Sequence, residues 1–217
     1  MVDTVVITGA GTPLGRAIAD RFVSRDAHVV LGGRDRDEVL AVADDLEAGG
    51  GEATGVRADE RDEFDLERLA ETASRAGGAG GIDVVVPAAS VRHDDPGESP
   101  LQETSYSAYD DTMRSNGRGV YATIKESVPH LTSGASVVVP IDDTASLVSK
   151  GVGPVGEAAR IALVGGFAAD LEQPVGATLA GEAVGGDVAD AADLVAWAAD
   201  LAPDVLNGAI LGPDDRS

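Results

Sequence analysis

The stretch that decides the fold is Thr8-Gly9-Ala10-Gly11-Thr12-Pro13-Leu14-Gly15, a glycine-rich turn near the amino terminus. The β-branched run Thr4–Thr8 leads into it, and the helix-forming Arg16-Ala17-Ile18-Ala19 follows it. A turn of this kind, between a first strand and a first helix, presents backbone N–H groups and the positive end of a helix dipole to phosphate. The stretch therefore predicts a dinucleotide-binding turn.

The rest of the chain alternates short β-branched runs with longer segments of helical periodicity, the pattern of parallel strands covered by helices. We expect strands near Thr4–Thr8, His28–Gly32, Glu52–Ala58, Asp83–Val86, Ser136–Pro140, Val175–Leu179 and Ala209–Leu211. We expect helices near Pro13–Ser24, Asp37–Glu47, Glu63–Arg75, Ala108–Leu131, Val155–Leu171 and Ala189–Leu201. The fold class is then α/β: one Rossmann-type domain over residues 1–217, with a doubly wound parallel sheet of about seven strands and helices on both faces.

The charge of the chain is unusual, because 38 acidic residues against 16 basic ones give a formal net charge of −22. The basic residues are 14 Arg and only 2 Lys, and the acidic residues are 25 Asp and 13 Glu. Such a chain, without a basic stripe, is a poor ligand for nucleic acid or an anionic membrane. An excess of Asp with scarce Lys resembles the proteins of salt-accumulating archaea, where salt screens self-repulsion. We expect a halophilic protein with an acidic surface; an ordinary acidic cytosolic protein is the alternative.

The residue types exclude several kinds of site. There is no cysteine, so disulfides, zinc-thiolate sites and thiol nucleophiles are ruled out. The 3 histidines are scattered, so no metal site is expected. No apolar stretch reaches the roughly 18 residues of a membrane span, and the first residues lead directly into a strand rather than an export signal. We expect a soluble, cytoplasmic protein.

The chain resembles the short-chain dehydrogenase/reductase family, whose first turn reads Thr-Gly-x-x-x-Gly-x-Gly. Thr8, Gly9 and Gly15 match that pattern, and Pro13 stands at the middle glycine. Proline suits the first turn of a helix, but it removes an N–H group where the family brings backbone close to phosphate. The resemblance covers essentially the whole chain and implies a nicotinamide dinucleotide held by the turn residues Gly9, Gly11, Thr12, Pro13, Leu14 and Gly15.

The resemblance also implies cofactor contacts beyond the turn. Arg34 stands where the family grips an adenosine 2′-phosphate, which favours NADP(H) over NAD(H); a plain surface charge is the alternative. Asp59 stands where a family Asp contacts the adenine amino group, with a solvated loop Asp as the alternative. These residues complete the expected cofactor site together with Glu60, Ala88 and Ala89.

The catalytic residues of that family are a Tyr, a Lys four residues later, a Ser and an Asn. Asn116 matches the Asn, whereas the Ser position is Asp142 or Asp143, the Tyr position is Gly156 and the Lys position is Arg160. Glycine has no proton to give, an ionised Asp repels a developing oxyanion, and Arg does not replace a compact ammonium group. The resemblance therefore implies degenerate catalytic positions and no ordinary carbonyl-reductase mechanism.

Two further features bear on activity. Tyr121 and Lys125 have the Tyr-x-x-x-Lys spacing, which places both side chains on one helical face. They fall in the helix before the catalytic one, so we expect a packing Tyr and a helix Lys. In the last quarter the chain runs quickly from Ala177–Glu182 to Asp187–Asp190, which predicts a shortened substrate region.

Three functions stay open at this point. The first is a dinucleotide-binding protein, NADP(H) favoured, without standard activity. The second is an active NAD(P)-dependent oxidoreductase whose acid comes from the loop Ser146–Lys150. The third is a structural or assembly subunit that binds no cofactor. The resemblance further implies self-association to a dimer or tetramer through the helices near 108–131 and 155–171, with neither nucleic acid nor membrane as a partner.

Overall fold

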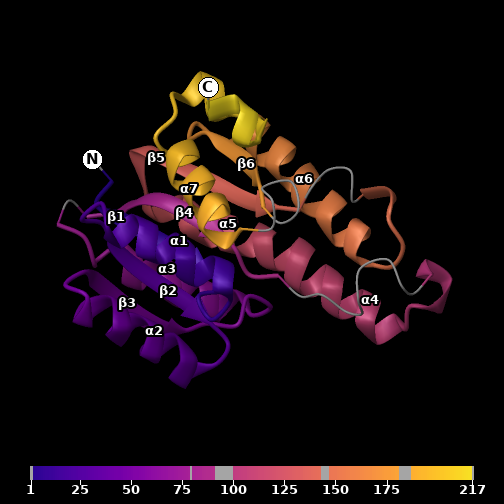
Figure 1. Cartoon of the computed structure of the whole chain (residues 1–217), viewed down its shortest axis with the longest axis horizontal. Coiled ribbons are helices and arrows are strands. Elements are labelled where there is room, and N and C mark those ends of the chain that lie inside the picture. Colours follow the sequence, from indigo (N-terminus) through magenta and orange to yellow (C-terminus); the bar gives the residue numbers. More distant parts are fainter. Residues whose placement is uncertain (1, 79, 91–99, 143–146, 181–186, 217) are drawn as a thin grey trace.

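The computed structural model describes residues 2–78, 80–90, 100–142, 147–180 and 187–216. Within them, seven strands form one parallel sheet in the order β3-β2-β1-β4-β5-β6-β7 (Figure 1). The strands are β1 (Thr4–Thr8), β2 (His28–Gly33), β3 (Glu52–Arg57), β4 (Ile82–Pro87), β5 (Leu131–Ile141), β6 (Val175–Leu179) and β7 (Ile210–Leu211). The order reverses between β1 and β4, and such a sheet binds ligands at the carboxyl ends of its strands beside that reversal.

Helices connect the strands. They are α1 (Pro13–Val23), α2 (Arg36–Ala48), α3 (Glu63–Ala73), α4 (Tyr106–Thr112), α5 (Val120–Ser127), α6 (Gly153–Asp170), α7 (Val188–Ala199) and α8 (Pro203–Leu206). A π-helical segment, η2 (Met113–Gly119), joins α4 to α5. Short 3₁₀ turns are η1 (Leu101–Glu103), η3 (Val128–His130) and η6 (Pro213–Arg216). No helix in these parts of the chain is long and apolar enough to cross a membrane.

The sheet is covered on both faces. Val5 and Ile7 of β1 pack with the core under α1, α2 and α7, whereas Val6 packs with the core under α3, α5 and α6. Successive side chains of a strand point to opposite faces, so a strand that is apolar throughout is buried on both. The prediction of a doubly wound parallel sheet is confirmed.

The abundant Asp residues start several helices. Asp35, Asp62 and Asp187 are the N-caps of α2, α3 and α7, and the carboxylate of each accepts a hydrogen bond from backbone N–H in the first turn. A capping carboxylate also lies favourably at the positive end of the helix dipole. Part of the negative charge is therefore used locally to stabilise helix starts.

Two predicted elements were wrong in their bounds. The segment Ala108–Leu131 is not one helix, because α4 gives way to the π-helical η2 at Met113 and α5 ends at Ser127. The strand predicted at Ser136–Pro140 begins instead at Leu131, which pairs with Ile82 of β4. Strand pairing overrides the weak β-propensity of the polar residues there. The other predicted elements differ from the structure by at most two residues at either end.

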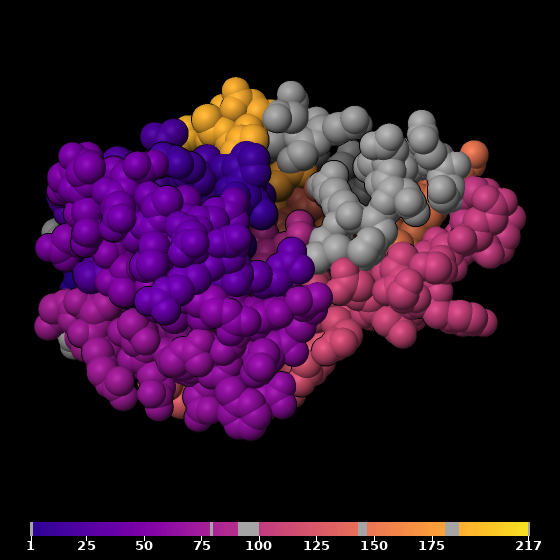
Figure 2. Space-filling model, turned by 90° about the horizontal axis from the view of Figure 1, so that it is seen from below, coloured from indigo at the N-terminus to yellow at the C-terminus, as the bar shows by residue number. Residues whose placement is uncertain are grey.

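The molecule narrows away from its amino-terminal body. In Figure 2 the indigo and purple half forms one bulk, and the pink segment, which includes α4, extends away from it. Tyr106 on α4 is 91% exposed, and Leu101 of η1 is half exposed. These apolar side chains lie on the segment farthest from the bulk of the sheet.

Candidate functional site

The predicted site residues gather at the carboxyl edge of the sheet, on both sides of the strand reversal. On what we call the β1–β3 side, the loops after β1, β2 and β3 hold Gly9, Gly11, Thr12, Pro13, Leu14, Gly15, Arg34, Asp59 and Glu60. On the β4–β5 side, the ends of β4 and β5, η2 and the start of α6 hold Ala88, Ala89, Asn116, Asp142, Gly156 and Arg160. Asp143 and Ser146 lie outside the described residues.

The turn after β1 requires its glycines. Gly9 has a φ of 75°, in the left-handed region, and a β-carbon on it would stand 2.7 Å from the backbone N and Cα of Ala89. A β-carbon on Gly15 would collide with the carbonyl oxygen of Gly9. The turn therefore folds back on itself and packs directly on the segment after β4, as a phosphate-binding turn at a strand reversal does.

Two N–H groups of the turn, those of Thr12 and Gly15, are satisfied within it. Thr12 is the N-cap of α1: its hydroxyl donates to the carbonyl of Gly9 at 2.8 Å and accepts from the N–H of Gly15 at 3.0 Å. The N–H of Thr12 also donates to Gly9, and Pro13 has no N–H. The N–H of Leu14 donates to no atom of the described residues. It is the first-turn donor of α1 left to an anion.

A carboxylate lies against this turn. The space that a β-carbon on Gly11 would fill is taken by the carboxylate of Glu38, from the first turn of α2. The turn is tied to the end of β2 through the hydrogen bond from Ala10 N–H to the Gly32 carbonyl, at 3.1 Å. Arg34 follows two residues later and is exposed. A phosphate at this corner would meet one cation and one anion.

Asp59 is engaged by a neighbouring arginine. Its two carboxylate oxygens accept from Nε and Nη2 of Arg61, at 2.9 and 2.8 Å. The Arg61 guanidinium holds the pKa of Asp59 below its ordinary value, and Asp59 in turn raises the pKa of Arg61. Arg61 also pairs with Asp111 of α4 at 3.1 Å. Asp59 is therefore the centre of an ion-pair group, although 19% of its side chain stays exposed.

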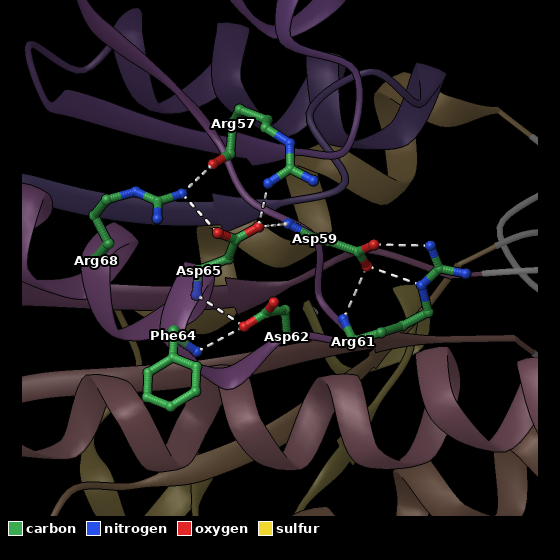
Figure 3. Close-up of polar contacts among 7 residues, drawn as sticks. All are labelled: Arg57, Asp59, Arg61, Asp62, Phe64, Asp65 and Arg68. Atoms are coloured by element: carbon green, nitrogen blue, oxygen red, sulfur yellow. Dashed lines mark hydrogen bonds and ion pairs between the residues drawn. The ribbon is translucent and has the colours of Figure 1, made fainter.

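A second carboxylate, that of Asp65, holds the backbone of the same loop (Figure 3). Asp65 of α3 accepts from Arg57 at 2.7 Å, from Arg68 at 2.8 Å and from the backbone N–H of Asp59 at 3.0 Å. Burial would raise the pKa of Asp65, but the hydrogen bonds and the two cations outweigh it and lower the pKa overall. Asp65 thus fixes the backbone of the loop that carries Asp59.

Glu60 turns away from this group and into the protein. It is 5% exposed, and its side chain packs against Gly119, where a β-carbon would stand 3.0 Å from the Glu60 Cγ. Gly119 ends η2, immediately before α5. The predicted cofactor residue Glu60 therefore contacts the end of η2, which belongs to the β4–β5 side.

Arg160 is the central residue of the β4–β5 side. It is 2% exposed, and its guanidinium donates to three main-chain carbonyls: Ala89 at 3.0 Å, Pro87 at 3.0 Å and Pro140 at 2.6 Å. These carbonyls belong to the ends of β4 and β5. A buried cation is tolerated where hydrogen bonds replace its water shell. Arg160 therefore holds two strand ends together from α6.

Gly156 and Asn116 close the space next to Arg160. A β-carbon on Gly156 would stand 2.9 Å from both Nδ2 of Asn116 and Cγ2 of Thr112. Contacts of this length require the neighbours to move, and Asn116 is only 3% exposed. The backbone of α6 thus packs directly on η2. Any side chain at position 156 would therefore require Asn116 and Thr112 to move.

Glu157 completes the contact of α6 with β5. Its carboxylate accepts from the backbone N–H of Asp142 at 2.9 Å, and the residue is 9% exposed. Glu157 and Arg160 are three residues apart, so they share one face of α6. Sequence reasoning missed Glu157, although two charges at helical spacing in an otherwise apolar helix were a usable signal. It also missed Arg61, Asp65 and Glu38, for which no pattern existed.

Tyr121 and Lys125 lie on α5. The Tyr121 ring stacks on Phe167 of α6, with centroids 5.8 Å apart, and Lys125 pairs with Glu126 at 2.5 Å. The hydrogen bond from Glu126 raises the pKa of Lys125, and a Lys that activates a phenol needs the opposite neighbourhood. Among the residues with described positions, no three His, Asp or Glu side chains gather as a metal site.

Comparison with known proteins agrees with this geometry. The family model "short chain dehydrogenase" matches residues 3–178. The cis-2,3-dihydrobiphenyl-2,3-diol dehydrogenase of Pseudomonas putida is 30% identical over 165 residues, which are 75% of this chain and 57% of that enzyme. The glucose 1-dehydrogenase of Gluconobacter oxydans is 32% identical over 57% of this chain and 45% of that enzyme. The chain thus spans about half the length of these curated relatives.

Solved structures match nearly the whole chain. A dehydrogenase/reductase from Sinorhizobium meliloti 1021 superposes with a TM-score of 0.84 at 28% identity, covering 96% of this chain and 92% of that one. A short chain dehydrogenase from Burkholderia cenocepacia J2315, in complex with NADP, superposes with the same TM-score at 23% identity, covering 96% and 95%. With the sheet order, the glycine turn and the match over residues 3–178, this chain belongs to the short chain dehydrogenase family, an oxidoreductase family that binds nicotinamide dinucleotides.

Proposed function

We propose that this protein binds a dinucleotide, NADP(H) in preference to NAD(H), and has no ordinary carbonyl-reductase activity. The observation that carries the proposal is the set of hydrogen bonds that the buried Arg160 guanidinium makes. A family Lys at this position would stabilise a phenolate and hold ribose hydroxyls, but the guanidinium is committed to three main-chain carbonyls. Gly156 at the Tyr position supplies no acid, and the space beside it is filled. The degenerate positions Asn116, Asp142, Gly156 and Arg160 are thus structural in this proposal.

Cofactor binding is supported by the β1–β3 side. The self-packed glycine turn, the N–H of Leu14 and the dipole of α1 are groups that suit a pyrophosphate. Arg34 is exposed at the end of β2 and makes no hydrogen bond to another described residue, so its guanidinium is available to a 2′-phosphate. When bound, a nicotinamide dinucleotide supplies hydride chemistry; among the described residues of the β4–β5 side, we assign none the role of moving a proton to its substrate.

Titration with NADPH and NADH in molar salt tests the binding, and turnover assays on ketones, aldehydes and quinones test the missing activity. Positioned proton transfer contributes about 10²–10⁴-fold to such rates, so we expect saturable binding without detectable turnover. Robust turnover would favour the alternative of an acid from the Ser146–Lys150 loop, where Ser149 and Lys150 are exposed. Absence of binding would favour the structural-subunit alternative.

The cofactor preference has its own test. Arg34→Ala removes a charged hydrogen-bond donor from the 2′-phosphate, which costs about tenfold in affinity. We expect that loss for NADPH and less than about twofold for NADH. Arg75→Ala is the matched control, because Arg75, just after α3, has a 74% exposed side chain and pairs only weakly with Glu71. Equal losses for both cofactors would remove the role assigned to Arg34.

The proposal includes self-association through α4–α5 and α6, in the segments 108–131 and 155–171. Family members are commonly oligomeric, and exposed aromatic side chains support this face: Tyr109 is 42% exposed and Tyr121 is 44% exposed. Gly165 and Gly166 of α6 have open space above them, which allows close approach of another helix. Light scattering in molar salt should report a dimer or tetramer; a monomer at micromolar concentration contradicts this part.

The proposal also assigns the protein to a salt-rich cytoplasm, with one domain and a shortened substrate region. The net charge of −22 and the two Lys support it. Lowering the salt from 1 M to 0.1 M lengthens the screening distance from about 3 Å to about 10 Å, which lets acidic side chains repel one another. Melting followed by circular dichroism should show a large loss of stability at low salt, and an unchanged midpoint rejects the halophilic origin.

A further inference from the structure

We propose that this site recognises the adenosine half of a dinucleotide and gains nothing from the nicotinamide half. The ligand class is then a phosphorylated adenine nucleotide: 2′-phospho-ADP-ribose, which lacks the nicotinamide, binds as tightly as NADP⁺ or NADPH. This inference rests on the proposed function, because it concerns the same crevice. It goes beyond that function by stating which part of the ligand supplies the affinity.

The polar groups available to a ligand lie on the β1–β3 side. A dinucleotide spans the strand reversal, with its adenosine over the first turn and the end of β2, and its nicotinamide over β4 and β5. The hydroxyls of Ser115 and Thr178 have no hydrogen-bond partner among the described residues, but these residues are only 1% and 0% exposed. Three other groups in the described part of the chain are left to a ligand: the N–H of Leu14, the amino end of the 11-residue α1 and the guanidinium of Arg34. All three belong to the β1–β3 side.

On the β4–β5 side, polar groups at the strand ends are already hydrogen-bonded within the protein. The carbonyls of Pro87, Ala89 and Pro140 are the acceptors at the ends of β4 and β5 that a ribose hydroxyl could use, and Arg160 already donates to each of them. The N–H of Asp142 donates to Glu157 at 2.9 Å. The Asp142 N–H has no second hydrogen to donate, and each of these carbonyls keeps one lone pair, which a ligand reaches only where the packing leaves room.

The described part of the β4–β5 side is also closely packed. The helix α6 and η2 approach so closely at Gly156 and Asn116 that even one methyl group would stand 2.9 Å from the Asn116 amide. Asn116 and Arg160 are 3% and 2% exposed. Among the described residues of this side, a nicotinamide riboside meets close packing at Gly156 and strand-end carbonyls that Arg160 already binds. A nicotinamide riboside that stays in solvent contributes little affinity. Holding it in one place would cost rotational freedom.

Calorimetric titration of the whole chain in molar salt tests this directly, with five ligands: NADP⁺, NADPH, 2′-phospho-ADP-ribose, adenosine 2′,5′-bisphosphate and nicotinamide mononucleotide. We expect the first three to bind within about twofold of one another. Adenosine 2′,5′-bisphosphate should follow within about tenfold, because it loses one phosphate of the pyrophosphate. Nicotinamide mononucleotide should show no saturation at millimolar concentration.

The outcomes separate the inference from the proposed function. If NADP⁺ or NADPH binds at least tenfold more tightly than 2′-phospho-ADP-ribose, the nicotinamide half is recognised and the inference is wrong, while the proposed function stands. Saturable binding of nicotinamide mononucleotide has the same meaning. If no adenine nucleotide binds, the proposed function fails, and the inference fails with it.

A variant confirms which side is used. Arg34→Ala should weaken NADPH and 2′-phospho-ADP-ribose by the same factor, about tenfold, because both carry the 2′-phosphate. Arg75→Ala, with the same change of charge at an exposed position just after α3, should leave both affinities unchanged. A loss confined to NADPH would show that the two ligands sit differently, which overturns the inference.

Discussion

The β1–β3 side and the β4–β5 side lie along one edge of one sheet, but they are built differently. On the β1–β3 side, Arg34 is exposed and Arg61 keeps 29% of its side chain in solvent. On the β4–β5 side, Arg160 is 2% exposed and buried among main-chain carbonyls. The first side is organised as a surface and the second as part of the core. The difference shows that a family fold can keep one half of its crevice open while the other is closed by its own side chains.

The largest expected effect comes from removing the buried cation. Arg160→Met leaves three strand-end carbonyls without donors, which should lower the free energy of unfolding by about 3–5 kcal/mol. Denaturant unfolding in molar salt measures it. Arg75→Met, at an exposed position, should change stability by less than about 0.5 kcal/mol. A loss below about 1 kcal/mol for Arg160→Met would mean that the β4–β5 side is not held as a core.

The next effect tests the closed packing at Gly156. Gly156→Ala places a methyl group against Asn116 and Thr112, which should cost about 1–3 kcal/mol of stability despite the better helix propensity of alanine. Gly153→Ala is the matched control on the same helix, because its β-carbon meets nothing within 4 Å and it lies outside the proposed self-association segment 155–171. That change should be neutral or stabilise by up to about 1 kcal/mol. If both variants are stabilised, position 156 has room for a side chain.

A smaller effect tests the rim of the open side. Asp65→Asn removes the charge that binds Arg57 and Arg68, and should cost about 1–2 kcal/mol at neutral pH. Folding lowers the pKa of Asp65. Its stabilising contribution is therefore full above the pKa of the unfolded chain, about 4, and is lost as the pH falls through the lower folded pKa.

Unfolding measured from pH 7 down to pH 3 should show the difference between wild type and Asp65→Asn shrinking below about pH 4. Asp62→Asn is the control on the same turn, because Asn caps a helix as well as Asp does. It should be neutral within about 0.5 kcal/mol. A pH-independent difference for Asp65→Asn would show that its charge is not what holds the loop.

The smallest expected effect concerns the anion at the phosphate corner. The Glu38 carboxylate lies against Gly11, where it repels a nearby phosphate. Glu38→Gln should tighten NADPH binding by about threefold to fivefold, and NADH by less. Glu47→Gln, on the exposed far end of α2, should change neither affinity. No change with Glu38→Gln would indicate that the carboxylate swings away when a nucleotide binds.

Much of the fold follows from local sequence. The glycine turn, the β-branched runs and the Asp N-caps are short-range signals, so six of the seven strands and most helices could be predicted within two residues. The failures lie where tertiary contacts decide. The start of β5 at Leu131 depends on pairing with Ile82, and the π-helical η2 depends on α6 packing against it. Neither contact leaves a periodic pattern in the sequence.

The sequence by itself determined the order of elements and the position of the glycine turn, and it predicts Gly156 and Arg160 at the family's Tyr and Lys positions. Those depend on which residue stands where along the chain. Only the tertiary structure decided which groups Arg160 contacts. Arg160 could have faced solvent, a phosphate or a carboxylate; it donates to Ala89, Pro87 and Pro140 because burial on α6 leaves main-chain carbonyls as its acceptors. The chain positions of those carbonyls span 53 residues, and hydrogen bonds over such separations are set by packing rather than by local pattern.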